Sequence, residues 1–134
     1  VMRRGDFNAD HKSDVVWHNA SSSANSIWLS ANVNTLQAMA TVPNRAFVIV
    51  GAGDFDGDGR SDVLWRNIST GQNSIWRSGL VAQAQLIGGI ADQAWQAVGI
   101  GDFNNDGRDD ILWRNMQTGT NSSWWSMREF NVYN

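Results

Sequence analysis

One unit of sequence occurs three times in this chain of 134 residues, always 48 residues apart. The tripeptide Gly-Asp-Phe begins at residues 5, 53 and 101, and no insertion interrupts the spacing that follows it. Segments 14–19, 62–67 and 110–115 each begin with Asp, have Trp in fourth place and end with Asn. A fixed period of this length is typical of solenoids, propellers and other repeat arrays. The chain is therefore predicted to be an array of three structural units.

Each unit contains short segments with the properties of β-strands. Residues 47–53 are apolar and rich in glycine, and residues 62–67 combine β-branched with aromatic side chains. Residues 73–76 form a third candidate strand, and 81–90 contain a weaker fourth one. No segment has the sustained 3.6-residue periodicity of an amphipathic helix. Four short antiparallel strands in a unit of roughly 50 residues are typical of a propeller blade.

The predicted fold class is therefore all-β, a β-propeller with three four-stranded antiparallel blades. The chain would form one propeller, or a propeller fragment, with blades at about 1–45, 46–93 and 94–134. Three blades are fewer than a closed ring contains. We therefore expect either further blades of a longer chain, or a homo-oligomer. The favoured oligomer is a dimer that closes a six-blade ring, and an open stack is the alternative.

Composition narrows the function. Twelve of the 13 acidic residues are Asp, and 11 of these lie in the windows 6–14, 54–62 and 102–110. The absence of Cys excludes a disulfide scaffold, a thiolate metal site and a Cys nucleophile. Basic residues are scattered, so no patch for nucleic acid is formed. No apolar run approaches the roughly 20 residues of a membrane helix, so membrane insertion is not expected.

The acidic windows have the pattern of a cation-binding loop. In residues 54–62, side chains with oxygen atoms occupy positions 1, 3, 5 and 9, and position 6 is Gly59, which permits a sharp turn with positive φ. Oxygen ligands without a His or Cys ligand favour Ca²⁺ over zinc or copper. A solvated Asp/Gly turn is the alternative for one copy. Three copies in register disfavour that alternative. An EF-hand is disfavoured because its loop has 12 residues, ends in Glu and is flanked by helices.

The segment Gly-Asp-Phe-Asp-Gly-Asp-Gly-Arg-Ser-Asp-Val-Leu-Trp-Arg-Asn, residues 53–67, resembles the FG-GAP/VCBS family. These are the calcium-binding blade repeats of integrin α-subunit propellers and of many bacterial surface proteins. The resemblance covers all three units and implies up to three Ca²⁺ ions, one in the loop between the first two strands of each blade. The first loop departs from the pattern at Ala9 and His11.

The ligands implied by the resemblance include one main-chain carbonyl in each loop, that of the Lys or Arg residue. Loop by loop, the implied ligands are Asp6, Asn8, Asp10, Lys12 and Asp14; Asp54, Asp56, Asp58, Arg60 and Asp62; and Asp102, Asn104, Asp106, Arg108 and Asp110.

The expected function is recognition or adhesion outside the cell, by a secreted or cell-surface Ca²⁺-binding propeller. The resemblance implies glycans, bound as by a lectin, or cell-surface proteins as partners. The alternatives are an accessory propeller of a secreted hydrolase or toxin, and a purely structural self-assembling scaffold. We do not expect an enzyme. His11 and His18 are the only histidines, and no Ser-His-Asp or paired-Glu arrangement can be assembled from the repeated residues.

The tryptophans divide into repeated and unrepeated positions. Trp95 and Trp125 do not recur, and are better candidates for function than the repeated ones. Arg66 and Arg114 are expected to pair with neighbouring carboxylates. The repeated tryptophans are expected to form the core between blades, and they are Trp17, Trp65 and Trp113, and Trp28, Trp76 and Trp124.

Overall fold

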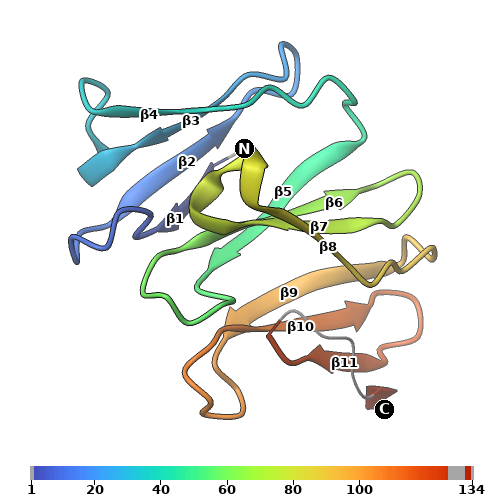
Figure 1. Cartoon of the computed structure of the whole chain (residues 1–134). Coiled ribbons are helices and arrows are strands. Elements are labelled where there is room, and N and C mark those ends of the chain that lie inside the picture. Colours follow the sequence, from blue (N-terminus) through green and yellow to red (C-terminus); the bar gives the residue numbers. More distant parts are fainter. Residues whose placement is uncertain (1, 127–131, 134) are drawn as a thin grey trace.

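The computed structural model describes residues 2–126 and 132–133, which form three separate four-stranded antiparallel sheets (Figure 1). We call these sheets blades 1, 2 and 3. Blade 1 contains β1 (Met2–Gly5), β2 (Asp14–His18), β3 (Asn25–Trp28) and β4 (Leu36–Met39). Blade 2 contains β5 (Phe47–Gly53), β6 (Asp62–Asn67), β7 (Asn73–Trp76) and β8 (Ala84–Ile87). Blade 3 contains β9 (Trp95–Gly101), β10 (Asp110–Asn115), β11 (Asn121–Trp124) and β12 (Val132–Tyr133).

The all-β prediction is confirmed, and each sheet has its strands in chain order as a meander. The strands expected at 47–53, 62–67 and 73–76 have those bounds, and the weak fourth strand is β8. The helices among the described residues are three short 3-10 turns, η1 (Leu29–Ala31), η2 (Arg77–Gly79) and η3 (Val81–Gln83). The three blades do not form a closed ring. The expected outer limits of blades 1 and 3, Val1 and Asn134, lie outside the described residues.

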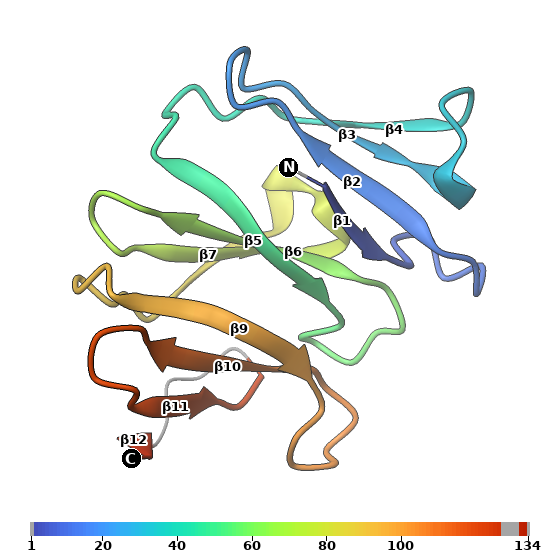
Figure 2. The same ribbon diagram turned by 180° about the vertical axis from the view of Figure 1, so that it is seen from behind.

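The blades are arranged around their first strands. Figure 2 shows β1, β5 and β9 side by side, with the later strands of each blade extending away from them. The loops that join the first and second strand of each blade all project from the same side of the molecule. The three acidic windows therefore share one end of the array.

The core lies between blades. One cluster joins blades 1 and 2, and its buried members are Phe7, Val16, Ile27, Ile49, Val63, Trp65 and Trp76. The second joins blades 2 and 3, and its buried members are Phe55, Leu64, Ile75, Ile111, Trp113 and Trp124. Each interface combines Phe and aliphatic side chains of one blade with the Trp pair of the next. The prediction that repeated tryptophans pack between blades is confirmed for blades 2 and 3.

The turn between the second and third strand repeats with the same side-chain bonds. In blade 2, Asn67 Oδ1 accepts hydrogen bonds from the N–H groups of Ser69 and Thr70, at 2.9 and 3.0 Å. Gly71 has φ of +81°, and a Cβ there would lie 1.8 Å from the carbonyl oxygen of Ile90. Only glycine suits that position, because both the backbone conformation and the space exclude a side chain.

Candidate metal centre

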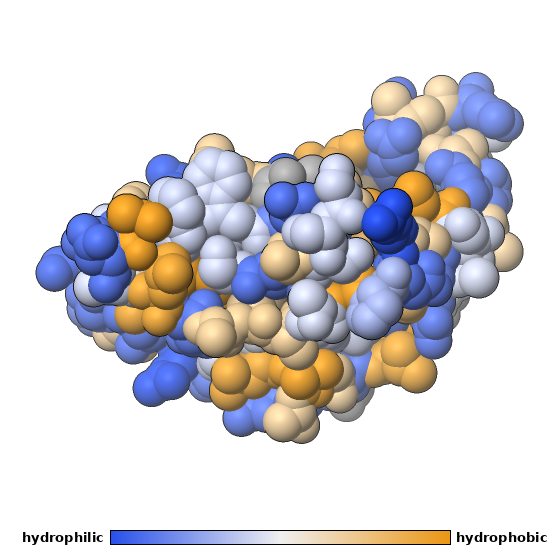
Figure 3. Space-filling view, turned by 90° about the horizontal axis from the view of Figure 1, so that it is seen from above, coloured by the Kyte–Doolittle hydropathy of each residue, from blue (hydrophilic) through white to orange (hydrophobic). Residues whose placement is uncertain are grey.

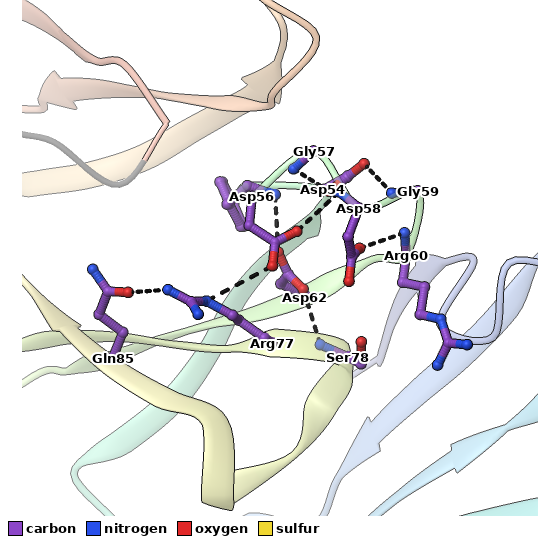
Figure 4. A network of polar contacts seen from close by, with 11 residues as sticks. Asp54, Asp56, Gly57, Asp58, Gly59, Arg60, Asp62, Arg77, Ser78 and Gln85 are labelled. Atoms are coloured by element: carbon purple, nitrogen blue, oxygen red, sulfur yellow. Dashed lines mark hydrogen bonds and ion pairs between the residues drawn. The ribbon is translucent and has the colours of Figure 1, made fainter.

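The loop of blade 2 is held in shape by its own carboxylates (Figure 4). Asp54 Oδ1 accepts hydrogen bonds from the N–H groups of Gly57 and Asp58, and Asp54 Oδ2 accepts one from Gly59 N–H at 2.9 Å. Asp56 Oδ1 accepts from Asp58 N–H at 3.0 Å. These bonds turn the loop back on itself and bring its odd-numbered side chains together.

Three carboxylates gather as a result. One oxygen each of Asp54, Asp56 and Asp58 lies within 4.8 Å of the others, and this is the one such group of acidic or metal-ligating side chains within the described part of the chain. Asp54 and Asp56 are half-buried and Asp58 is exposed. Like charges this close repel one another, and hard oxygen donors at such spacing suit a divalent cation such as Ca²⁺. The residues present fit the predicted ion.

A nearby cation already offsets part of this charge. Arg77 Nε lies 3.7 Å from Asp56 Oδ2, and the Arg77 guanidinium also donates a hydrogen bond to Gln85 (Figure 4). Leu29 and Trp125 occupy the equivalent positions of blades 1 and 3, so this ion pair does not recur. An Arg at this position lowers the electrostatic attraction of the loop for a second cation.

Asp62, the predicted ninth-position ligand, lies outside the group of three and is fully buried. Its Oδ2 accepts a hydrogen bond from Phe55 N–H and its Oδ1 accepts one from Ser78 N–H, both at 2.9 Å. Burial raises the pKa of Asp62 to about 7, the two N–H donors lower it, and the charges of Asp56 and Asp58 raise it. A positive charge close to this carboxylate would favour its ionised form.

The serine that binds this carboxylate was missed from the sequence, although it repeats. Ser30, Ser78 and Ser126 stand 48 residues apart, and each has positive φ. Ser30 N–H donates to Asp14 Oδ1 at 2.8 Å, and Ser126 N–H donates to Asp110 Oδ1. The ninth-position Asp therefore ties the acidic loop to the end of the third strand in every blade. A search for repeated polar positions outside the acidic window would have found these serines.

The loops of blades 1 and 3 follow the same path with one fewer carboxylate. Asn8 and Asn104 replace Asp56, and each side-chain amide donates to the fifth-position carboxylate, Asp10 at 3.2 Å or Asp106 at 3.3 Å. His11 N–H donates to Asp6 Oδ2 at 2.9 Å, as Gly59 N–H does to Asp54. An amide nitrogen directed at a candidate ligand oxygen competes with a cation for it. These two loops are therefore weaker candidates than that of blade 2.

Positive φ occurs at two positions of each loop. The sequence indicated position 6, and the structure confirms it at His11, Gly59 and Gly107, with φ of 63°, 84° and 83°. The fourth position was missed, and it is Ala9, Gly57 and Asn105. Blade 1 thus places two side chains other than glycine in the left-handed region, at a cost of about 1 kcal/mol or more each.

The carbonyl ligands implied at position 7 stay a prediction. The structure gives the N–H groups of these residues, which donate to the fifth-position carboxylate in all three loops. The donors are Lys12, Arg60 and Arg108, and the distances are 2.9, 2.8 and 2.9 Å.

The acidic loops also join neighbouring blades. Ser61 N–H donates to the Asp6 carbonyl at 2.6 Å, and Ser61 Oγ accepts from Asp6 N–H at 2.8 Å. Asp109 binds the main chain of Asp54 in the same way, at 2.7 Å for both bonds. We call this pair of bonds the clasp. The eighth position of one loop thus fixes the first candidate ligand of the preceding blade, which sequence reasoning did not anticipate.

The expectation for Arg66 is wrong. Its guanidinium donates to the carbonyls of Gly71 and Ile90 and to the side-chain oxygens of Asn73 and Gln93, which are all neutral. It also lies 5.1 Å from the ring centroid of Trp113 in the next blade. Burial lowers the pKa of Arg66, and the charge of Asp92 opposes that shift. This side chain fastens two blades together and is not free to bind an anion.

Comparison with protein families supports this description. A family model for the FG-GAP-like repeat matches twice, at residues 6–65 and 54–113. The chain belongs to the FG-GAP-like repeat family. The two matches overlap and together include all three acidic loops. Comparisons with curated proteins and with solved structures returned no match.

Membership indicates a propeller-like module for adhesion or recognition. FG-GAP-like repeats often bind Ca²⁺ and are typical of extracellular proteins, which agrees with the carboxylate group of blade 2. In the described part of the FG-GAP-like chain, no helix has the length and hydrophobicity needed to cross a membrane.

Proposed function

We propose that this chain is a secreted, non-catalytic recognition module whose blades are stabilised by Ca²⁺ in the three acidic loops. The observation that supports it best is the group formed by Asp54, Asp56 and Asp58, with oxygen atoms within 4.8 Å of one another. The same loop path recurs around Asp6 and Asp102. The ions would neutralise charge at the end of each blade where the clasp holds the next blade.

Bound Ca²⁺ should stabilise the folded chain by mass action. At a free concentration 100 times Kd, one site contributes about 2.7 kcal/mol, which corresponds to an increase in melting temperature on the order of 10 °C. The experiment compares thermal unfolding in excess EDTA with unfolding in millimolar Ca²⁺, followed by the fluorescence of the buried tryptophans. The same melting curve in both conditions would contradict the proposal.

A variant links the effect to the loop. Asp58→Ala removes one of the three gathered carboxylates and should abolish most of the gain in melting temperature. Asp92→Ala is the control, because it removes the same charge from a position outside the acidic windows. Equal loss of the Ca²⁺ effect in both variants would show a nonspecific response to charge.

Glycan recognition is the favoured ligand chemistry, and a cleft between blades 2 and 3 supports it. The cleft has a volume of about 300 Å³, and Arg66, Gln93, Trp95 and Gln96 are among the residues that line it. Trp95 is the unrepeated tryptophan of β9 and is half-buried. An aromatic face beside amide groups suits a neutral sugar ring, which presents both apolar C–H groups and hydroxyls.

A glycan array in Ca²⁺ tests this assignment. We expect binding that is lost in Trp95→Ala and kept in Trp125→Ala, the other unrepeated tryptophan. Binding unaffected by Trp95→Ala would exclude the cleft as the sugar site. If no glycan binds, the accessory propeller of a secreted hydrolase or toxin and the structural scaffold become the better assignments.

A further inference from the structure

The two ends of the array are the unpaired halves of the interface that the chain forms twice within itself. We call the outer side of blade 1 the leading face, with Ser13 and Trp17, and the outer side of blade 3 the trailing face, with Gly101, Phe103 and Arg114. We propose that the leading face of one copy binds the trailing face of a second copy, so that two chains close one ring of six blades.

The aromatic side chains show the missing contacts. Phe7 and Phe55 are 1% and 0% exposed, because the next blade covers them, whereas Phe103 is 56% exposed on the trailing face. On the other side of the interface, Trp65 and Trp113 are 1% and 0% exposed, whereas Trp17 is 37% exposed on the leading face. Each end lacks what the other end presents. Figure 3 views the blade 1 side and shows separate hydrophobic patches among residues of intermediate hydropathy.

The clasp is incomplete at the same two places. Asp6 and Asp54 have their main chains held by Ser61 and Asp109, but within the described residues no hydrogen bond reaches the main chain of Asp102. The residue at the clasp position of blade 1 is Ser13, which is exposed and has no hydrogen-bond partner among these residues. A second copy would supply Ser13 to Asp102 as Ser61 is supplied to Asp6. The acidic loop of blade 3 is thus completed by the partner.

Basic side chains add to the complementarity. Arg66 lies over Trp113 across the interface of blades 2 and 3, and the exposed Arg114 would take the same place over Trp17 of the second copy. Ile100 approaches the positions where Gly51 and Gly53 would carry a Cβ, to 2.1 and 2.7 Å. Blade 1 has Arg4 in place of Ile100, which would bring a positive charge beside the acidic loop 102–110 of the second copy. This opposite charge favours the contact between copies.

The number of copies follows from the blade count. Propellers typically close with four to eight blades. One chain supplies three blades, two chains supply six, and three chains would supply nine. Two copies are therefore the number that falls within the range, and the resulting ring has two identical head-to-tail interfaces related by a two-fold axis.

Light scattering after size-exclusion chromatography measures the assembly directly. The 134-residue chain at micromolar concentration in millimolar Ca²⁺ should have twice its mass of 14.8 kDa. A single species of 14.8 kDa would overturn the proposal, and the two faces would then belong to another partner. Species that keep growing with concentration would overturn ring closure.

Three variants test the contact itself. Gly101→Ala should raise the dimer dissociation constant at least tenfold. A Cβ at the equivalent Gly5 would lie 2.7 Å from Ser61, while a Cβ at Gly101 meets only its own loop's Phe103, at 3.6 Å. Gly89→Ala is the matched control, because its Cβ would make ordinary contacts of 3.5 Å or more within blade 2.

Phe103→Asp and Ser13→Trp address one face each, and both positions are exposed in the single chain. Each should give a folded monomer, checked by circular dichroism. If only one of the two dissociates the dimer, the faces pair with themselves and the head-to-tail arrangement is wrong.

Discussion

The acidic loops of blades 1 and 2 follow the same path with different residues. In both, the first-position Asp accepts hydrogen bonds from the fifth and sixth N–H groups, and the ninth-position Asp binds the N–H groups of residues 2 and 25 of the motif. Blade 2 has Gly57 and Gly59 at the positive-φ positions, and blade 1 has Ala9 and His11. The shared side-chain to main-chain bonds determine the shape, whereas the few differing residues determine its strain and charge.

The largest expected effect concerns what the two loops share. Asp62→Asn and Asp14→Asn should each lower the free energy of unfolding by about 2–3 kcal/mol in EDTA. The new amide group faces a buried N–H donor and leaves it without an acceptor. Chemical denaturation measures the loss. Asp56→Asn is the control, because Asn8 and Asn104 already occupy this position in the other loops. A loss in the control as large as in Asp62→Asn would show that the charge matters and not the hydrogen bonds.

The second effect concerns charge. The loop at 54–62 has four carboxylates, and those at 102–110 and 6–14 have three each at the predicted ligand positions, so affinity for Ca²⁺ should decrease in the order second, third, first. We expect about tenfold between second and first, or 1.4 kcal/mol. Calorimetric titration of Asp58→Ala, Asp106→Ala and Asp10→Ala tests the order. Loss of the tightest site in Asp10→Ala would reverse it.

The third effect concerns strain, and an exchange of residues isolates it. His11→Gly should stabilise the chain by about 0.5–1 kcal/mol in EDTA, and Gly59→His should destabilise it by about as much. A Cβ at Gly59 meets nothing within 4 Å, so the loss would come from backbone conformation and not from a clash. Thermal unfolding of both variants gives the two values. Changes of the same sign would contradict this account of the difference between the loops.

The smallest effect concerns Arg77, which pairs with Asp56 in blade 2 and has Leu29 as its counterpart in blade 1. Arg77→Leu should strengthen Ca²⁺ binding at the second loop about two- to threefold, because a partly exposed ion pair contributes less than about 1 kcal/mol. Arg45→Leu removes the same charge from an exposed position and serves as the control. An affinity unchanged relative to Arg45→Leu would show that the ion pair does not oppose the cation.

The sequence predicts those parts of the structure that repeat by residue type. Strands β5, β6 and β7 were predicted with their bounds, because β-branched and aromatic segments recur beside turn residues. The group of Asp54, Asp56 and Asp58 was predicted because alternating carboxylates have a recognisable spacing. Family resemblance supplied the propeller arrangement, which spacing alone indicates less specifically.

The remainder depends on contacts across long separations. Ser61 and Asp109 share a position but not a residue type, so the clasp has no single sequence signature. The neutral partners of Arg66 come from a turn and a linker, whose approach depends on how the blades pack. The buried role of Asp62 requires knowing that Ser78 turns back toward the loop, which no local pattern shows.

The clasp makes the array directional. Each bond pair joins a loop to a residue 55 positions later in the chain, so no blade can complete its own acidic loop. During synthesis, the loop of blade 1 stays open until Ser61 has left the ribosome, and that of blade 2 waits for Asp109. Blades therefore mature one after another from the N-terminus, and each newly made blade finishes its predecessor. In an array of this kind the most recently made loop is always the unfinished one, and whatever chain completes it determines where growth ends.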